Sequence, residues 1–216
     1  DQRDFDGGDG EREDQRSVRF ADPVGHDFSV VNRGNHRGQQ HRRLQAHAQG
    51  MGQIARIGVG IKTQVPSVMN GLTVWENIWL AARRIHGRER ASSEVDRVIQ
   101  EMELGSFARR RVGELAHGQR QIVELGLVLA QQPWLVLLDE PAAGITGAET
   151  ERLVALIRRI NETATLVVVD HDMHFVKMLG GSVTVMHQGA VLMEGAIDAV
   201  LRDPRVREVY IGSRAK

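Results

Sequence analysis

Hydrophobic and polar positions divide the chain into two parts of different character, with the boundary near Met51. Before that point the apolar residues are scattered and follow neither the period of 2 of a strand nor the period of 3.6 of a helix. Asp, Arg, Gly, Gln and His dominate there, and Ile, Lys and Met are missing, so the stretch buries little apolar surface by itself. We therefore expect residues 1–50 to be an aberrant or disordered segment and residues 51–216 to form the folded domain.

After Met51 the pattern alternates between strand and helix. Strands are expected at 57–64, 135–138 and 165–169, and a hairpin at 183–186 and 190–193 around the turn at 187–189. Helices are expected at 72–84, 92–102, 119–130 and 149–160, with Ser92 or Ser93 as the N-cap of the second. This order predicts an α/β fold with a parallel sheet, in which ligands bind at the carboxyl ends of the strands.

Composition excludes several classes of function. Among 216 residues, 28 Lys and Arg balance 28 Asp and Glu, so charge indicates neither nucleic acid nor an anionic membrane as a partner. Without cysteine there are no disulfides and no thiolate metal sites. No apolar run approaches the roughly 18 residues that span a bilayer.

Two adjacent acids, Asp139 and Glu140, follow the apolar run 135–138 and precede Pro141. At the end of a buried strand, the first acid suits Mg²⁺ and the second can orient an attacking water. Taken alone, the pair could also be a solvated strand end that caps the next helix, which is the less favoured interpretation.

Three further candidates are weak individually. Leu115-Ala116-His117-Gly118-Gln119 precedes a helix whose N-terminus attracts anions, although the same pattern also describes a simply capped helix. His171 follows the strand at 165–169 and could donate to a phosphoryl oxygen, but a lone histidine is usually an ordinary polar residue. Gln64 ends another predicted strand.

The order of these motifs is specific. Gln64, then 115–119, then 135–140, then His171 resembles the Q-loop, signature motif, Walker B strand and switch histidine of the ATP-binding subunits of ABC transporters. The resemblance covers about Met51 to Gly212. It implies a RecA-like P-loop NTPase core of the ABC ATPase type at 51–216, with a helical subdomain inserted at 70–113.

The resemblance also implies a mechanism shared between two copies. Asp139 would hold Mg²⁺, Glu140 would polarise the attacking water, and His171 would contact the γ-phosphate of ATP. Gln64 would sense the metal and couple to the membrane partner. The signature residues Leu115, Ala116, His117, Gly118 and Gln119 would face ATP bound to a second ATPase subunit, in a homodimer or heterodimer. Transmembrane permease subunits, and indirectly a periplasmic or extracellular solute-binding protein, are the implied partners, which places the chain on the cytoplasmic face of the plasma membrane.

Smaller details are similar to the urea-uptake branch of the family. They are His117 in the signature, the stretch 61–66, and the stretch from Glu140 through Thr146 to Thr150. The ending 208–212 is shared with the branched-chain amino-acid importers, which are the alternative. A soluble ABC ATPase of repair or translation is a rival, but it normally carries two cassettes or a long coiled-coil insert. An inactive remnant is the other rival.

The remnant is considered because a glycine-rich phosphate loop, G-x-x-G-x-G-K-[ST], is missing. In that loop backbone N–H groups wrap the phosphates and the lysine neutralises them. The only lysines here are Lys62, Lys177 and Lys216. Shifted by one base, the codons of residues 7–14 can encode G-x-x-G-x-G-K-T. Our hypothesis is that residues 1–50 translate a displaced reading frame; the alternative is a natural, divergent N-terminus.

Overall fold

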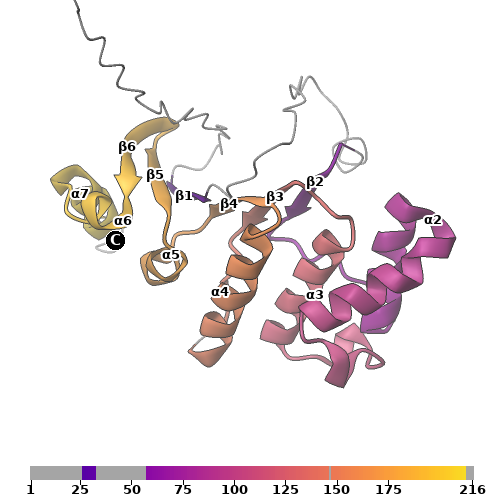
Figure 1. Cartoon of the computed structure of the whole chain (residues 1–216). Coiled ribbons are helices and arrows are strands. Elements are labelled where there is room, and N and C mark those ends of the chain that lie inside the picture. The colour runs from indigo at the N-terminus through magenta and orange to yellow at the C-terminus, as the bar shows by residue number, and fades with distance from the viewer. Residues whose placement is uncertain (1–25, 33–56, 146, 213–216) are drawn as a thin grey trace, which may run out of the picture.

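The computed structural model describes residues 26–32, 57–145 and 147–212, arranged as a six-stranded sheet with helices (Figure 1). The strands are β1 His26–Asn32, β2 Val59–Lys62, β3 Leu135–Asp139, β4 Thr165–Val169, β5 Ser182–His187 and β6 Ala190–Ala196. The α-helices are α2 Val74–Glu101, α3 His117–Leu129, α4 Ala148–Asn161, α5 Met173–Leu179, α6 Ile197–Val200 and α7 Pro204–Gly212. Short 3₁₀ turns, η1 Gly105–Phe107 and η2 Val112–Glu114, connect α2 to α3.

The strand order is β2-β3-β4-β1-β5-β6. The pairs β2–β3 and β3–β4 are parallel, as the sequence predicts, and β5 and β6 form the expected hairpin. Within the hairpin, Gln188 and Gly189 both have positive φ, of 50° and 77°, as a two-residue turn with right-handed strand twist requires.

One strand was not expected. We predicted no regular element before Met51, yet residues 26–32 form β1, which pairs antiparallel with both β4 and β5. Because β1 runs against two neighbours that share one direction, the sheet is mixed and not purely parallel. The β-branched and aromatic residues of the segment suit a strand once neighbours exist on both sides. The rest of the stretch, residues 1–25 and 33–50, lies outside the described residues.

Helix α2 joins the two helices that the sequence predicts at 72–84 and 92–102. The two halves meet at Gly87, whose φ of 75° and ψ of 179° are not helical. The first half begins at Thr73, where a capping box with Glu76 satisfies the end of the helix. The predicted N-cap at Ser92 or Ser93 is therefore wrong: both residues lie inside α2.

The helices α3, α4 and α5 lie on the same side of the sheet, and α2 packs on α3 away from the strands (Figure 1). Strands β3 and β4 carry apolar side chains on both faces, which explains their continuous apolar runs. Val136 and Leu138 of β3 belong to the large core beneath the helices, whereas Leu135 packs with Val59 and Val167 in a second cluster. Among the described residues, no helix is long and apolar enough to cross a bilayer.

Candidate functional site

Glu140 lies between the two other predicted catalytic side chains. Gln64 donates from Nε2 to Glu140 Oε2 at 2.7 Å, and His171 Nδ1 lies 3.2 Å from Glu140 Oε1. A carboxylate only accepts, so the proton of this contact sits on Nδ1 of His171. The three residues follow β2, β3 and β4, so the parallel register brings their strand ends to one edge. The structure therefore places Gln64, Glu140 and His171 together.

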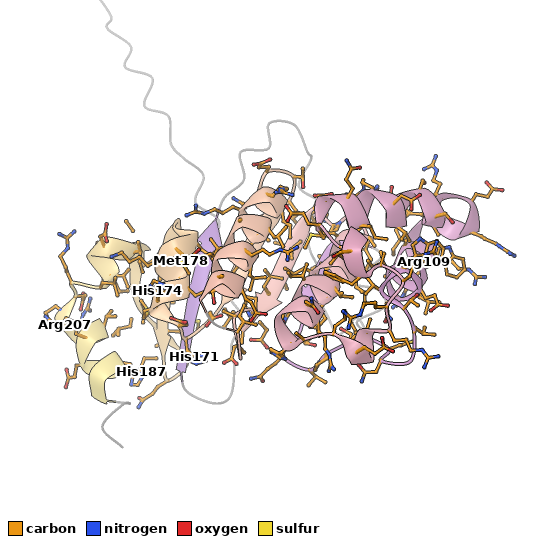
Figure 2. The ribbon with its side chains drawn as sticks, turned by 90° about the horizontal axis from the view of Figure 1, so that it is seen from below. Arg109, His171, His174, Met178, His187 and Arg207 are labelled. Carbon is orange, nitrogen blue, oxygen red and sulfur yellow. The ribbon has the colours of Figure 1, made fainter. Side chains whose placement is uncertain are left out.

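The site is open to solvent. The side chain of Glu140 is 27% exposed and that of His171 is 66% exposed. Figure 2 shows His171 in the sheet part of the molecule, well away from Arg109 in the part that contains α2. A phosphorylated ligand and a water molecule can reach a carboxylate at such an edge.

The backbone of Glu140 is unusual for a residue with a side chain. Its φ is 43°, in the left-handed region. Its N–H donates to the carbonyl of Val169 at 2.8 Å, which extends the β3–β4 ladder by one bond. Non-glycine residues are held this way where the surrounding structure determines the conformation, often at functional sites. Here the result is that the carboxylate turns toward Gln64 and His171.

Asp170, which the sequence analysis did not select, supports this arrangement. The residue is 2% exposed, and its Oδ1 accepts from the N–H of Asp172 at 2.9 Å. Its Oδ2 accepts from the N–H of Ala142 at 3.4 Å. Burial raises the pKa of Asp170 above its ordinary value, against the opposing effect of these two N–H groups. Asp170 thus ties the turn after Glu140 to the segment that carries His171.

The signature segment forms the beginning of α3. The N–H of Ala116 donates to Gln119 Oε1 at 3.1 Å, which caps the helix from within the motif. His117 is exposed, and its Nε2 lies 2.9 Å from the carbonyl oxygen of Ala143 in the turn that follows Glu140. The predicted signature segment is therefore linked through His117 to the turn that follows Glu140. Thr146, further along, lies outside the described residues.

Gly118 approaches another carboxylate. A Cβ at this position would lie 2.5 Å from Oε1 of Glu149, near the beginning of α4. Any residue with a Cβ at this position would displace the side chain of Glu149, whereas glycine does not. The segment 115–119 therefore contacts both the turn after Glu140 and the helix that follows it.

Asp139, the predicted Mg²⁺ ligand, is exposed at the end of β3 and adjacent to Glu140. Carboxylate and amide oxygens of the kind that Asp139 and Gln64 offer are the ligands that Mg²⁺ prefers. Gln64 contacts Glu140 through Nε2, so its Oε1 is not used in that bond. Within the described part of the chain, no group of three or more His, Cys, Asp or Glu forms a protein-only metal cage.

A sequence model of the ABC transporter family matches residues 33–143. The chain belongs to the ABC transporter family. The match contains Gln64, the segment 115–119 and the acids Asp139 and Glu140, and it ends before His171.

Curated relatives are ATP-binding proteins of the ABC type. A probable ABC transporter ATP-binding protein of Azorhizobium caulinodans is 31% identical over 160 residues, covering 73% of this chain and 57% of its own length. BraF of Pseudomonas aeruginosa, a high-affinity branched-chain amino acid transport ATP-binding protein, is 34% identical over 116 residues, covering 53% and 46%. LivG of Escherichia coli, described in the same words, is 30% identical over 178 residues, covering 74% and 70%. The chain thus spans only 57% and 46% of the lengths of the first two relatives.

A solved ATP-binding cassette of an ABC transporter has the same fold. The TM-score is 0.68 at 24% identity, over 74% of this chain and 71% of that one. The structure of its ADP conformation gives 0.65. The predicted fold class, an α/β ABC ATPase core, is confirmed.

Proposed function

We propose that this ABC protein is the ATP-hydrolysing subunit of an importer. The single observation that carries the proposal is the placement of Glu140 between Gln64 and His171 at one edge of the sheet. A base must lie within hydrogen-bonding reach of the water it activates, and a partly exposed carboxylate at a strand end meets that requirement. The family membership of the chain and the names of its relatives support ATP as the substrate.

In the proposed mechanism Glu140 orients and polarises the water that attacks the γ-phosphate. His171 holds the carboxylate on one side and is the group that contacts the γ-phosphate. Gln64 holds the carboxylate on the other side and links the site to the loop that leads to α2. When bound, Mg²⁺ neutralises phosphate charge, and Asp139 and Gln64 are the residues that would hold it.

Nucleotide fits only part of this site. The residues for metal and water are present, but the sequence holds no glycine-rich phosphate loop. Lys62 cannot replace the lysine of that loop, because it is 2% exposed and its Nζ lies 3.5 Å from Glu124 Oε2. We propose that the missing loop reflects a displaced reading frame over residues 1–50, and that residues 51–216 are the ATPase domain.

A second ATPase subunit completes the proposed unit. The signature residues 115–119 are exposed or partly exposed at Ala116, His117 and Gln119, at the positively polarised end of α3. That end suits the phosphates of a nucleotide held by another subunit. We propose that two copies of the chain, or this chain and a homologue, pair across this surface.

The helical subdomain at 70–113 is the proposed contact with transmembrane permease subunits. Trp75 and Trp79 stack there with ring centroids 6.3 Å apart, and Arg109 and Arg83 lie over their rings. Tryptophan and arginine are enriched in protein interfaces. In the loop before α2, Val65 and Met69 are 75% and 56% exposed, which is high for apolar residues. Binding there would hold the chain at the cytoplasmic face of the membrane.

The first candidate solute is urea or a short-chain amide. This choice is supported by His117 in the signature and by the sequence from Glu140 to Thr150. Branched-chain amino acids are the second candidate, favoured by the described functions of BraF and LivG. Proteoliposomes containing the permease subunits encoded beside this chain would decide between them: ATP-driven uptake of labelled urea supports the first, and uptake of labelled leucine alone rejects it.

ATPase activity is tested with purified chain, Mg²⁺ and ATP. We expect Glu140→Gln to lower kcat about a hundredfold or more, since positioned acid–base groups contribute at least that much. Glu162→Gln, an exposed change just beyond α4, is the matched control and should behave like the wild type. Equal rates for the wild type and Glu140→Gln would reject hydrolysis by this chain.

A further inference from the structure

The side chain of His117 forms a hydrogen bond with the turn that follows Glu140. Its Nε2 lies 2.9 Å from the carbonyl oxygen of Ala143, which is 26 residues further along the chain. A carbonyl oxygen can only accept, so Nε2 must carry the proton. The donor therefore persists in both the neutral and the charged imidazole.

Gln121, one turn further along α3, fits this assignment once its side-chain amide is turned over. Its side-chain nitrogen lies 3.3 Å from Nε2 of His117, where two donors would face one another. Its Oε1 is buried without a hydrogen-bond partner among the described residues. A half-turn of the amide places Oε1 against the Nε2–H, so that one proton serves both Gln121 and Ala143. The imidazole is then held by its own helix while it holds the turn.

Among the described residues, the other hydrogen bonds of the turn do not use the carbonyl of Ala143, which accepts from His117. The N–H of Ala143 donates to the carbonyl of Glu140 at 3.2 Å, and the N–H of Ala142 donates to Asp170. Gly144 has a φ of 74°, and a Cβ there would lie 3.0 Å from His117 Nε2. The turn thus leaves space for the imidazole.

We propose that His117 is a positioning residue that couples the N-terminus of α3 to the backbone of Glu140. The turn begins at Glu140, whose left-handed backbone depends on its surroundings. A shift of α3 moves the Ala143 carbonyl through the imidazole and thereby changes the direction of the Glu140 carboxylate. The effect on catalysis rests on the proposed ATPase function, whereas the bond between α3 and the turn does not.

Three substitutions of the exposed His117 separate this role from others. The side-chain nitrogen of glutamine takes the position of Nε2, that of asparagine falls short at the position of Nδ1, and leucine has no donor. Hydrogen–deuterium exchange of the peptide 139–147 measures the turn directly. We expect His117→Leu and His117→Asn to exchange about two- to tenfold faster, the effect of one lost hydrogen bond, and His117→Gln to match the wild type.

Two further measurements distinguish a positioning role of His117 from a role in which its imidazole gains or loses a proton. Nitrogen-15 spectra of labelled histidine should show the Nε2–H tautomer for neutral His117. If the chain hydrolyses ATP, His117→Leu should lower kcat severalfold, and His117→Gln should lower it less while keeping the wild-type pH profile. Unchanged exchange in His117→Leu, or an Nδ1–H tautomer, would overturn the proposal. An altered pH profile in His117→Gln would also overturn it, because it would mean that His117 acts by titrating. Absence of ATPase activity in the wild type rejects the proposed function but leaves the exchange result decisive.

Discussion

Lys62 Nζ lies 3.5 Å from Glu124 Oε2, and the two side chains are only 3% and 4% exposed. The pair joins β2 to α3, and so links the strand before Gln64 to the helix that begins at the signature. Burial raises the pKa of Glu124, and the positive charge of Lys62 counteracts that rise. Neither residue is free to contact a ligand, which makes the pair structural.

Removing one partner of this pair should be costly, whereas removing both should not. We expect Lys62→Met or Glu124→Leu to lower the free energy of unfolding by about 3–5 kcal/mol, because one buried charge then lacks its partner. The double variant Lys62→Met with Glu124→Leu should recover most of that loss. Urea unfolding of the wild type, the two single variants and the double variant measures the interaction energy between the two residues. Additive losses in the double variant would show that the two residues do not interact.

Low pH should restore part of the stability that Lys62→Met loses. Without lysine, burial raises the pKa of Glu124 still further above the ordinary value of 4.5. A raised folded pKa gives stability that is present at low pH and lost as pH rises through the folded value. The deficit of Lys62→Met relative to the wild type should therefore grow from acidic to neutral pH. A deficit that shrinks with rising pH would contradict this assignment.

Gly60 should not tolerate alanine. A Cβ at this position in β2 would lie 2.5 Å from Val128 Cγ1 of α3 and 3.1 Å from Pro133 Cγ, and neither group can rotate away easily. We expect a loss of about 1–3 kcal/mol on overpacking. Gly71→Ala is the matched control: its Cβ meets nothing within 4 Å, so stability should stay within about 0.5 kcal/mol. Thermal unfolding of both variants provides the comparison, and equal melting temperatures would show that β2 and α3 can move apart.

Local patterns were sufficient to predict most elements after Met51. The strand at 165–169 was predicted at its observed bounds, and β3 differs by one residue, because buried parallel strands are short apolar runs bounded by polar residues. The break between two helices was also anticipated. Its position at Gly87 was not, since a single glycine in a helical pattern does not show whether the helix continues.

Features that depend on tertiary neighbours could not be predicted from the sequence. β1 has no clear alternation, and its strand exists through pairing with β4 and β5. Gln64, Glu140 and His171 could be placed near one another because parallel strand ends share an edge. The bond of His117 to Ala143 and the bond of Asp170 to Ala142 could not be predicted, because each joins segments whose contact follows only from packing.

Asp170 should give stability an acid dependence opposite to that of an ordinary surface carboxylate. Burial raises its folded pKa above 3.8, so the native state binds more protons than the unfolded state between the two values. Relative to Asp170→Asn, which does not titrate, the wild type should lose stability as pH rises through this window and then level off. Urea midpoints of both proteins from acidic to neutral pH measure the difference. If the wild type instead becomes more stable relative to Asp170→Asn as pH rises, the two backbone N–H bonds lower the pKa of Asp170 by more than burial raises it.

The missing phosphate loop provides the last prediction. Under the displaced-frame hypothesis, the bases that encode residues 7–14 spell G-x-x-G-x-G-K-T in a neighbouring frame, and a chain translated from that frame gains the lysine that the present one lacks. Lys62 is held by Glu124 and cannot substitute for it. We expect the restored chain to bind ATP with Mg²⁺ at least about ten- to hundredfold more tightly, the effect of one hydrogen bond to a charged group. Titration calorimetry of the two chains measures the gain. Restoration of the frame with its lysine changed to alanine is the control, and it should remove most of the improvement. Bases that give no Gly-Lys-Thr in either neighbouring frame would reject the hypothesis before any protein is made.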